Sequence, residues 1–284
     1  MTISASAVLV ELNISVWTAN KLDKSATDTV ILANNALVTD AAQVRKNLMA
    51  GTSLRKRIAD FAAGCRLWHN TRTIPWSDKG ARLLPTSLFI DYKMEMNARR
   101  AQFEDMVKEF KEQYPDLVDI ARTSMGSLFD SNDYPSVEQL DDKFGFRLVF
   151  SPVPESGDFR LDIPQQDMDE MRKDYDSAFD ERISHAMRTP WERLHNLLTS
   201  MTSKLEEPEG DAKRRWHDSF ITNADEMCDM LKHLNVTQDP ELEQARLKLH
   251  EAMKGRNLDS ISEDQDERED LKGKLDNILK GFEW

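Results

Sequence analysis

Two stretches of the chain alternate between apolar and polar or small residues with a period of two. Residues 144–151 place phenylalanine or leucine at every second position, and residues 8–17 do the same with aliphatic side chains. This period is typical of a β-strand with one buried face. A shorter alternation over 158–163 follows a gap that contains two prolines and a glycine. We therefore predict a β-hairpin over 144–151 and 158–163, or a three-stranded antiparallel sheet if residues 8–17 join it.

Most of the remaining chain has the spacing of three or four residues between apolar positions that is typical of helices. The helices predicted in the first half cover residues 24–36, 41–50, 52–70 and about 87–125. Pro115 predicts a kink or a break in the last of these. Ser136 and Gln139 form a capping box that predicts a further short helix. These helices are expected to cover the phenylalanine face, because an isolated hairpin is only marginally stable in water.

The chain after residue 164 is predicted to be almost wholly helical. Thr189 and Pro190 fit the N-cap and first position of a new helix, which favours two helices or one kinked helix over a straight one. Later helices are predicted over 213–234, 240–254 and 262–280. Their apolar stripes fit helical hairpins in a bundle or a coiled-coil arm, and spacing alone does not separate the two. The predicted fold class is mainly α (α+β), with a small antiparallel β part.

Charge is unevenly distributed over the 284 residues, which carry 38 basic and 51 acidic side chains and a net charge of −13. Residues 1–110 hold 15 basic and 11 acidic side chains, and residues 111–284 hold 23 and 40. We therefore divide the chain into a mixed α/β domain with basic helices, 1–163, and an acidic helical region, 164–284, which we expect to oligomerise. The acidic part should repel nucleic acid and anionic membranes.

Composition also bears on the compartment. The sequence holds no apolar run of about 18 residues that could span a bilayer. Its first residues lack the basic segment of a signal peptide. Cys65 and Cys228 stand apart and form no CxxC motif, so neither a disulfide framework nor an oxidising compartment is indicated. We expect a cytoplasmic protein without membrane association.

The motifs of common enzymes are missing from the sequence. Neither of the glycine-rich nucleotide-binding motifs is present, and there is no GxSxG nucleophile motif. Glu192 and His195 form one ExxH motif, whereas di-iron bundles need two such motifs and two further glutamates. A metalloenzyme built on Glu192 and His195 is therefore a minor functional hypothesis, beside the two main ones given below. We predict no catalytic residue, no cofactor and no metal, and a protein that is not an enzyme.

The most unusual stretch by composition is 68–85, a predicted loop with two tryptophans and two prolines. It overlaps residues 41–82, which hold nine basic side chains and two acidic ones. Cations and aromatic rings together hold single-stranded nucleic acid through phosphate contacts and stacking. The alternative is that the tryptophans are buried in the core. The candidate contacts to nucleic acid or to a protein partner are Arg45, Arg55, Lys56, Arg57, Trp68, Arg72, Trp76, Lys79 and Arg82.

Four segments carry a resemblance to known sequences. They read LNISVWTANKLDK, WHNTRTIPWSDKGARLLP, FGFRLVFSPVPESGDFRLDI and AMRTPWERLH. Together they resemble an uncharacterised family of proteins encoded by tailed bacteriophages and prophages, over most of the chain. That family has no assigned activity and offers no catalytic residue for comparison. The resemblance implies only that the protein acts in the cytoplasm of an infected bacterium.

Two main functional hypotheses follow from these patterns. The first is a non-enzymatic helical interaction protein that assembles into a homo-oligomer and acts on a host or phage protein. The alternative is a DNA- or RNA-binding protein for phage replication or recombination, with residues 41–82 as its binding region.

Overall fold

The computed structural model describes residues 3–77, 80–154, 165–206, 216–282 and 284. The chain forms two compact units, which are interleaved along the sequence. Unit 1 is drawn from residues 1–11, 70–92 and 149–284, and unit 2 from residues 12–69 and 93–148. The sequential division at residues 163 and 164 stays a prediction, because its boundary lies outside the described residues.

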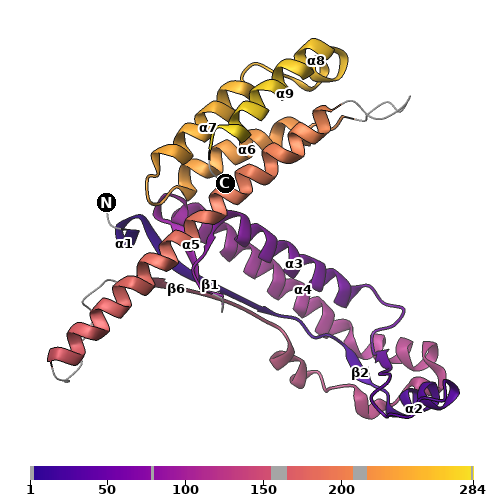
Figure 1. Ribbon diagram of the computed structural model, residues 1–284. Coiled ribbons are helices and arrows are strands. Elements are labelled where there is room, and N and C mark those ends of the chain that lie inside the picture. Colours follow the sequence, from indigo (N-terminus) through magenta and orange to yellow (C-terminus); the bar gives the residue numbers. More distant parts are fainter. Residues whose placement is uncertain (1–2, 78–79, 155–164, 207–215, 283) are drawn as a thin grey trace. The chain divides into compact units, whose positions relative to one another are not determined.

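A four-stranded sheet has the strand order β4-β5-β1-β6. Its strands are β1 (Ala7–Ser15), β4 (Ile74–Pro75), β5 (Arg82–Pro85) and β6 (Gly145–Pro152) (Figure 1). β1 pairs with β5 in antiparallel orientation, as β5 does with β4. β1 and β6 confirm the strands predicted over 8–17 and 144–151, whereas the strand predicted over 158–163 lies outside the described residues.

The prediction that 68–85 is a loop was wrong. Helix α3 (Leu54–Arg72) covers its first residues, and β4 and β5 occupy part of the rest. Ile74, Leu83 and Leu84 are fully buried, so this short segment supplies core residues. Strands of two and four residues are too short to show a period. They are defined by the pairing of β5 with the distant β1 and of β4 with β5.

The phenylalanine face of β6 is covered by helix α4 (Phe89–Ser124), as predicted. In unit 2 the Phe146 ring lies 5.7 Å from that of Phe103, and in unit 1 the Phe150 ring lies 5.1 Å from that of Phe89. α4 runs through Pro115 without a break.

Unit 2 also contains helix α2 (Lys24–Ala33) and a two-stranded antiparallel sheet of β2 (Asn20–Leu22) and β3 (Arg45–Asn47). The helix predicted over 41–50 was therefore wrong. The Lys46 ammonium lies 2.5 Å from the Asp133 carboxylate and donates to the Leu128 carbonyl oxygen at 3.0 Å. These long-range contacts hold the segment extended against its local helix preference.

Short 3₁₀ helices follow α4 in unit 2. They are η2 (Gly126–Leu128), η3 (Ser131–Asp133) and η4 (Glu138–Lys143). The Ser136 hydroxyl accepts from the Gln139 amide at 3.3 Å, and the Gln139 side chain accepts from the Ser136 amide at 2.9 Å. This reciprocal pair confirms the predicted capping box at the start of η4.

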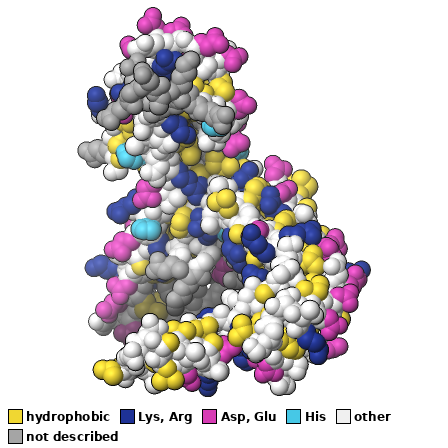
Figure 2. All heavy atoms as spheres, turned by 90° about the vertical axis from the view of Figure 1, so that its right-hand side faces the viewer, with side chains coloured by type: hydrophobic (Ala, Val, Ile, Leu, Met, Phe, Trp, Pro, Cys, Tyr) yellow, Lys and Arg dark blue, Asp and Glu magenta, His cyan; other side chains and the backbone are white. Residues whose placement is uncertain are grey.

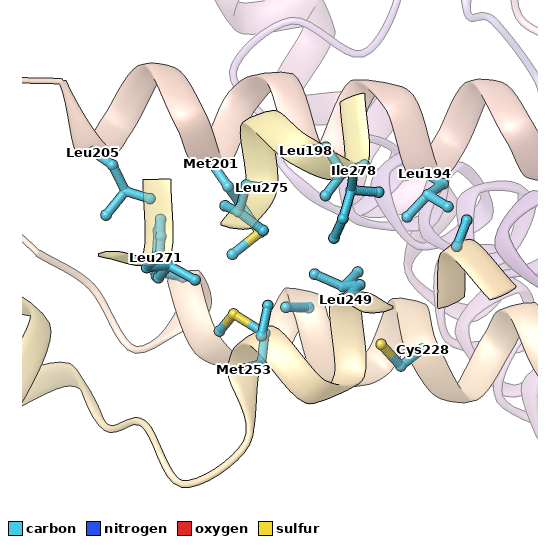
Figure 3. Packing of buried hydrophobic residues seen from close by; sticks show 14 of the residues in the cluster. Leu194, Leu198, Met201, Leu205, Cys228, Leu249, Met253, Leu271, Leu275 and Ile278 are labelled. Carbon is cyan, nitrogen blue, oxygen red and sulfur yellow. The ribbon is translucent and has the colours of Figure 1, made fainter. Parts of the chain in front are cut away.

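Unit 1 contains most of the helices. They are α1 (Ile3–Ser6), η1 (Thr86–Leu88), α5 (Gln165–Leu205), α6 (Ser219–Leu234), α7 (Pro240–Met253), α8 (Leu258–Glu263) and α9 (Gln265–Lys280). Figure 3 shows Leu198 of α5 near Ile278 of α9, with Leu249 of α7 on the other side of the same core. The predicted helical bundle is confirmed, and these apolar stripes pack within one chain.

Of the two alternatives predicted at Thr189, that of two separate helices was wrong, because α5 continues through Pro190 as one helix. Pro190 is buried, and the fully buried Leu194 and Leu198 follow it on the side of α5 that packs into the bundle. Packing along this whole face stabilises one long helix despite the local start signal.

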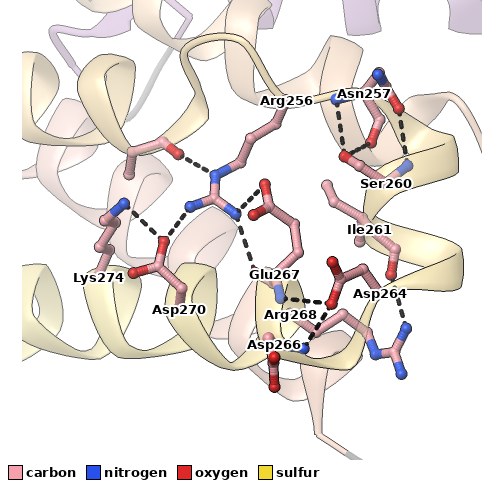
Figure 4. Close-up of polar contacts among 11 residues, drawn as sticks. Arg256, Asn257, Ser260, Ile261, Asp264, Asp266, Glu267, Arg268, Asp270 and Lys274 are labelled. Carbon is pink, nitrogen blue, oxygen red and sulfur yellow. Dashed lines mark hydrogen bonds and ion pairs between the residues drawn. The ribbon is translucent and has the colours of Figure 1, made fainter.

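A buried arginine joins α7 to α9. Arg256 donates to the Ala252 carbonyl oxygen at 2.8 Å and to the Glu267 carbonyl oxygen at 3.0 Å. Its guanidinium also pairs with the carboxylates of Glu267, at 2.7 Å, and of Asp270 (Figure 4). The corner between the helices is thus fixed by one charged side chain that satisfies two backbone carbonyls.

Candidate functional site

Three predicted basic residues near the start of α3 lie in unit 2. Arg55 donates to the Thr18 carbonyl oxygen at 2.8 Å, and Arg57 lies 3.8 Å from the Glu109 carboxylate. Lys56 is exposed between them. Successive helical positions are about 100° apart, so these three side chains leave α3 in different directions. They do not form a single-faced basic patch.

Two further predicted contacts in unit 2 have different surroundings. Arg45 is exposed on β3. The half-buried Trp68 ring has the guanidinium of Arg99 over it, 5.0 Å from the ring centre. Arg99 also pairs with Glu95 at 2.7 Å. One face of the Trp68 ring is therefore occupied by a cation of the same unit.

The remaining predicted contacts belong to unit 1. Trp76 is only 7% exposed, and its ring lies edge-to-face with that of Phe179 at 5.5 Å. It is a core residue and is not accessible for base stacking. Arg72 donates to the Thr71 hydroxyl at 2.9 Å. Lys79 lies outside the described residues. The predicted set is thus divided between the two units.

Arg82, the last predicted contact, lies beside an arginine that sequence reasoning did not identify. Arg193 of α5 donates to the carbonyl oxygens of Asn70, Thr71 and Thr73 at 2.6–2.9 Å. Arg82 donates to the Thr73 hydroxyl at 2.6 Å. No sequence signal could have paired these arginines, because they are far apart in the chain and share no motif.

An exposed apolar patch lies on α2 and the segments that flank it in unit 2. Leu37 is 100% exposed, Leu32 75% and Val38 58%. Together with Leu22 and Val30, these residues form what we call the α2 patch. Figure 2 shows hydrophobic side chains exposed on the face nearest to α2. The sequence predicted this helix, but it did not predict that Val30 and Leu32 would be exposed. Only Thr27 and Ile31 of the helix are buried.

The two units differ in charge. Unit 2 contains 16 basic and 16 acidic residues and is neutral, whereas unit 1 contains 22 and 35 and carries the whole net charge of −13. Around the α2 patch, exposed Lys21, Lys24 and Arg45 are balanced by exposed Asp28 and Asp40 and by half-buried Asp23. Electrostatic repulsion between copies is therefore concentrated on unit 1.

Unit 2 also has an open groove of about 590 Å³ between α4 and the segment from η4 to β6. Phe103, Val107 and Phe146 supply apolar walls. Lys111 and Asp141 form an ion pair at its edge, at 2.5 Å. Glu104, Lys108 and Glu112 also line the groove.

Groups capable of chemistry are dispersed. In unit 1 the Ser87 hydroxyl lies 2.9 Å from His233 Nδ1, a nucleophile–base spacing. A triad would need a carboxylate on the other ring nitrogen, but the nearby Asp229 binds Lys232 at 2.8 Å. Among the residues that the structure describes, no group of histidine, cysteine and acidic side chains could hold a metal ion.

His195 of the ExxH motif and the two cysteines lie in apolar or aromatic surroundings. The His195 ring lies 5.0 Å from the Trp284 ring. Burial raises the pKa of the Cys65 thiol and raises that of Cys228 to about 11. Both cysteines are therefore protonated and poorly nucleophilic at neutral pH. None of the described helices is long and apolar enough to cross a membrane.

Comparison with known proteins gives no relative. No protein-family model, no curated protein and no solved structure matches the chain. The resemblance to phage-encoded proteins stays a prediction.

Proposed function

We propose that the protein is a non-enzymatic interaction protein that self-assembles by pairing the α2 patch of one copy with the same patch of a second copy. The observation that carries this proposal is the exposure of Leu32 and Leu37. Large apolar side chains that are exposed together on one segment of a domain mark an interaction site more often than singly exposed residues do.

The local structure of α2 makes this exposure informative. Asp23 caps the helix by accepting from the Ala26 amide at 2.9 Å, and Ile31 anchors the helix to unit 2. The helix is thus held in place with Val30 and Leu32 facing outward, on either side of Ile31 in sequence. A rigid apolar surface binds a partner without a large ordering cost.

Charge favours a second copy as the occupant. A two-fold interface brings identical surfaces together, so a surface with a strong net charge would repel itself. The α2 patch is flanked by charges of both signs, and unit 2 as a whole is neutral. The net charge of −13 belongs to unit 1, which does not contain the α2 patch.

The same proposal includes a cellular role. In the infected bacterium that the family resemblance implies, the assembled protein acts in the cytoplasm on a host or phage protein. This role is inferred from the resemblance to phage-encoded proteins.

Sedimentation velocity over a range of protein concentrations tests self-assembly. Covering one leucine contributes about 1.5–3 kcal/mol, so we expect Leu32→Asp with Leu37→Asp to weaken a dimer by at least 100-fold. Leu67→Asp is the matched control, because Leu67 is 66% exposed elsewhere in unit 2. Wild-type protein that is monomeric at every concentration would refute the proposal.

A second candidate, nucleic-acid binding, is favoured by exposed Lys56 and Arg45, for which the described residues show no ion pair. We propose it only for the unit 2 part of the predicted region. It predicts that binding of a fluorescent single-stranded oligonucleotide falls steeply as salt rises. Reversal of charge at Arg55, Lys56 and Arg57 should abolish binding, and unchanged binding in that triple variant would exclude this region.

A further inference from the structure

Two arginines of unit 1 converge on the same backbone oxygens at the end of α3. Arg82 Nη2 lies 3.4 Å from the Asn70 carbonyl oxygen and 3.1 Å from that of Thr73. Arg193 Nη2 lies 2.6 and 2.9 Å from the same two oxygens. Since both nitrogens contact one oxygen, they lie within about 6 Å of each other. Two like charges are thus held side by side.

The groups around the two arginines do not neutralise them. A helix C-terminus supplies about half a negative charge, whereas two guanidiniums carry two full positive charges. Within the described part of the chain, no carboxylate pairs with either arginine. Burial, and then repulsion from Arg193, lowers the pKa of Arg82 to about 10, and burial lowers the pKa of Arg193. The pair therefore has an unsatisfied preference for an anion.

Each guanidinium also keeps donors that are not used by the backbone. A guanidinium carries five N–H groups. Arg82 uses Nε and Nη2 on Thr73 and Asn70, which leaves Nη1. Arg193 uses Nη1 and Nη2, which leaves Nε. The backbone contacts fix both side chains, so binding by the remaining donors needs little further ordering.

We propose that Arg82 and Arg193 together form a binding site for a phosphate group. A phosphate dianion matches the two positive charges, and its several oxygens can accept from two guanidiniums at once. A carboxylate offers one charge and two oxygens, so it matches the pair less well. The site lies wholly within unit 1, and it does not depend on self-assembly through unit 2.

Isothermal titration calorimetry of the full-length protein with inorganic phosphate, at constant ionic strength, tests this site. We expect one equivalent to bind wild-type protein, and Arg82→Gln or Arg193→Gln to weaken binding at least tenfold. Arg188→Gln removes an exposed arginine from the same helix, α5, and should bind phosphate as wild type does. Absence of phosphate binding to wild-type protein, or equal binding by all the variants, would overturn the proposal.

Two additions keep the result interpretable. Arg82→Lys retains the charge but not the forked donors, so it should weaken phosphate binding with little change in melting temperature. If it binds phosphate as tightly as wild type does, paired guanidiniums are not the determinant. A second titration with a dinucleotide phosphodiester identifies the source of the group. Tighter binding of inorganic phosphate assigns the site to a dianion, and tighter binding of the diester assigns it to a nucleic-acid backbone.

Discussion

Replacement of Arg256 by methionine is expected to destabilise unit 1 strongly. The side chain of Arg256 is only 7% exposed, and methionine preserves much of its apolar stem. The substitution leaves the carbonyl oxygens of Ala252 and Glu267 without this donor. It also removes the Arg256 partner of the Glu267 carboxylate and one of the two cations paired with Asp270. The corner between α7 and α9 then has unpaired acceptors in place of a closed network.

The expected loss can be estimated from these contacts. Each backbone hydrogen bond from a charged donor contributes about 1.5 kcal/mol, so the two together give a loss of about 3 kcal/mol. The ion pairs add little to this figure, because the carboxylates of Glu267 and Asp270 are 33% and 51% exposed.

Urea unfolding followed by circular dichroism at 222 nm measures this loss. Lys254→Met is the control, because Lys254 lies two residues away with a side chain that is 68% exposed. It should change the free energy of unfolding by less than about 0.5 kcal/mol. A loss below about 1 kcal/mol for Arg256→Met would show that the corner does not depend on these hydrogen bonds.

Three further predictions concern local packing. A Cβ at Gly145 would lie 2.9 Å from the Ser15 Oγ, so Gly145→Ala should cost about 1–3 kcal/mol of stability, and Ser15→Gly should restore part of it in a urea-unfolding double-mutant cycle. Asp239 caps α7 by accepting from two backbone amides, so Asp239→Ala should lower the free energy of unfolding by about 1 kcal/mol, and an unchanged midpoint would exclude a capping role. Buried Cys65 and Cys228 should react slowly with a chromogenic disulfide at pH 8 and rapidly after unfolding in urea, and fast reaction of the folded protein would contradict their burial.

Local patterns were sufficient for part of the fold. The long strands β1 and β6 have a clear period of two, and the capping box at Ser136 is a local signal, which the structure confirms. Such features depend on residues that are neighbours in sequence, so the sequence alone determines them.

Features that depend on distant partners could not be predicted in this way. β3 is extended because it pairs with β2 and because Lys46 binds Asp133, and these contacts override the helix signal of residues 41–50. α5 passes through Pro190 because its packing face continues on both sides. The junction of Arg82 and Arg193 brings together residues 111 positions apart that share no motif.

Cross-linking of a single introduced cysteine tests self-assembly through the α2 patch most directly. Leu37→Cys places a fully exposed thiol in the patch, and Leu67→Cys places one on α3, while both native cysteines are buried. With a short bis-maleimide at micromolar protein concentration, Leu37→Cys should give a covalent dimer under denaturing electrophoresis and Leu67→Cys should not. Equal cross-linking of the two variants, or none in either, would contradict pairing through this surface.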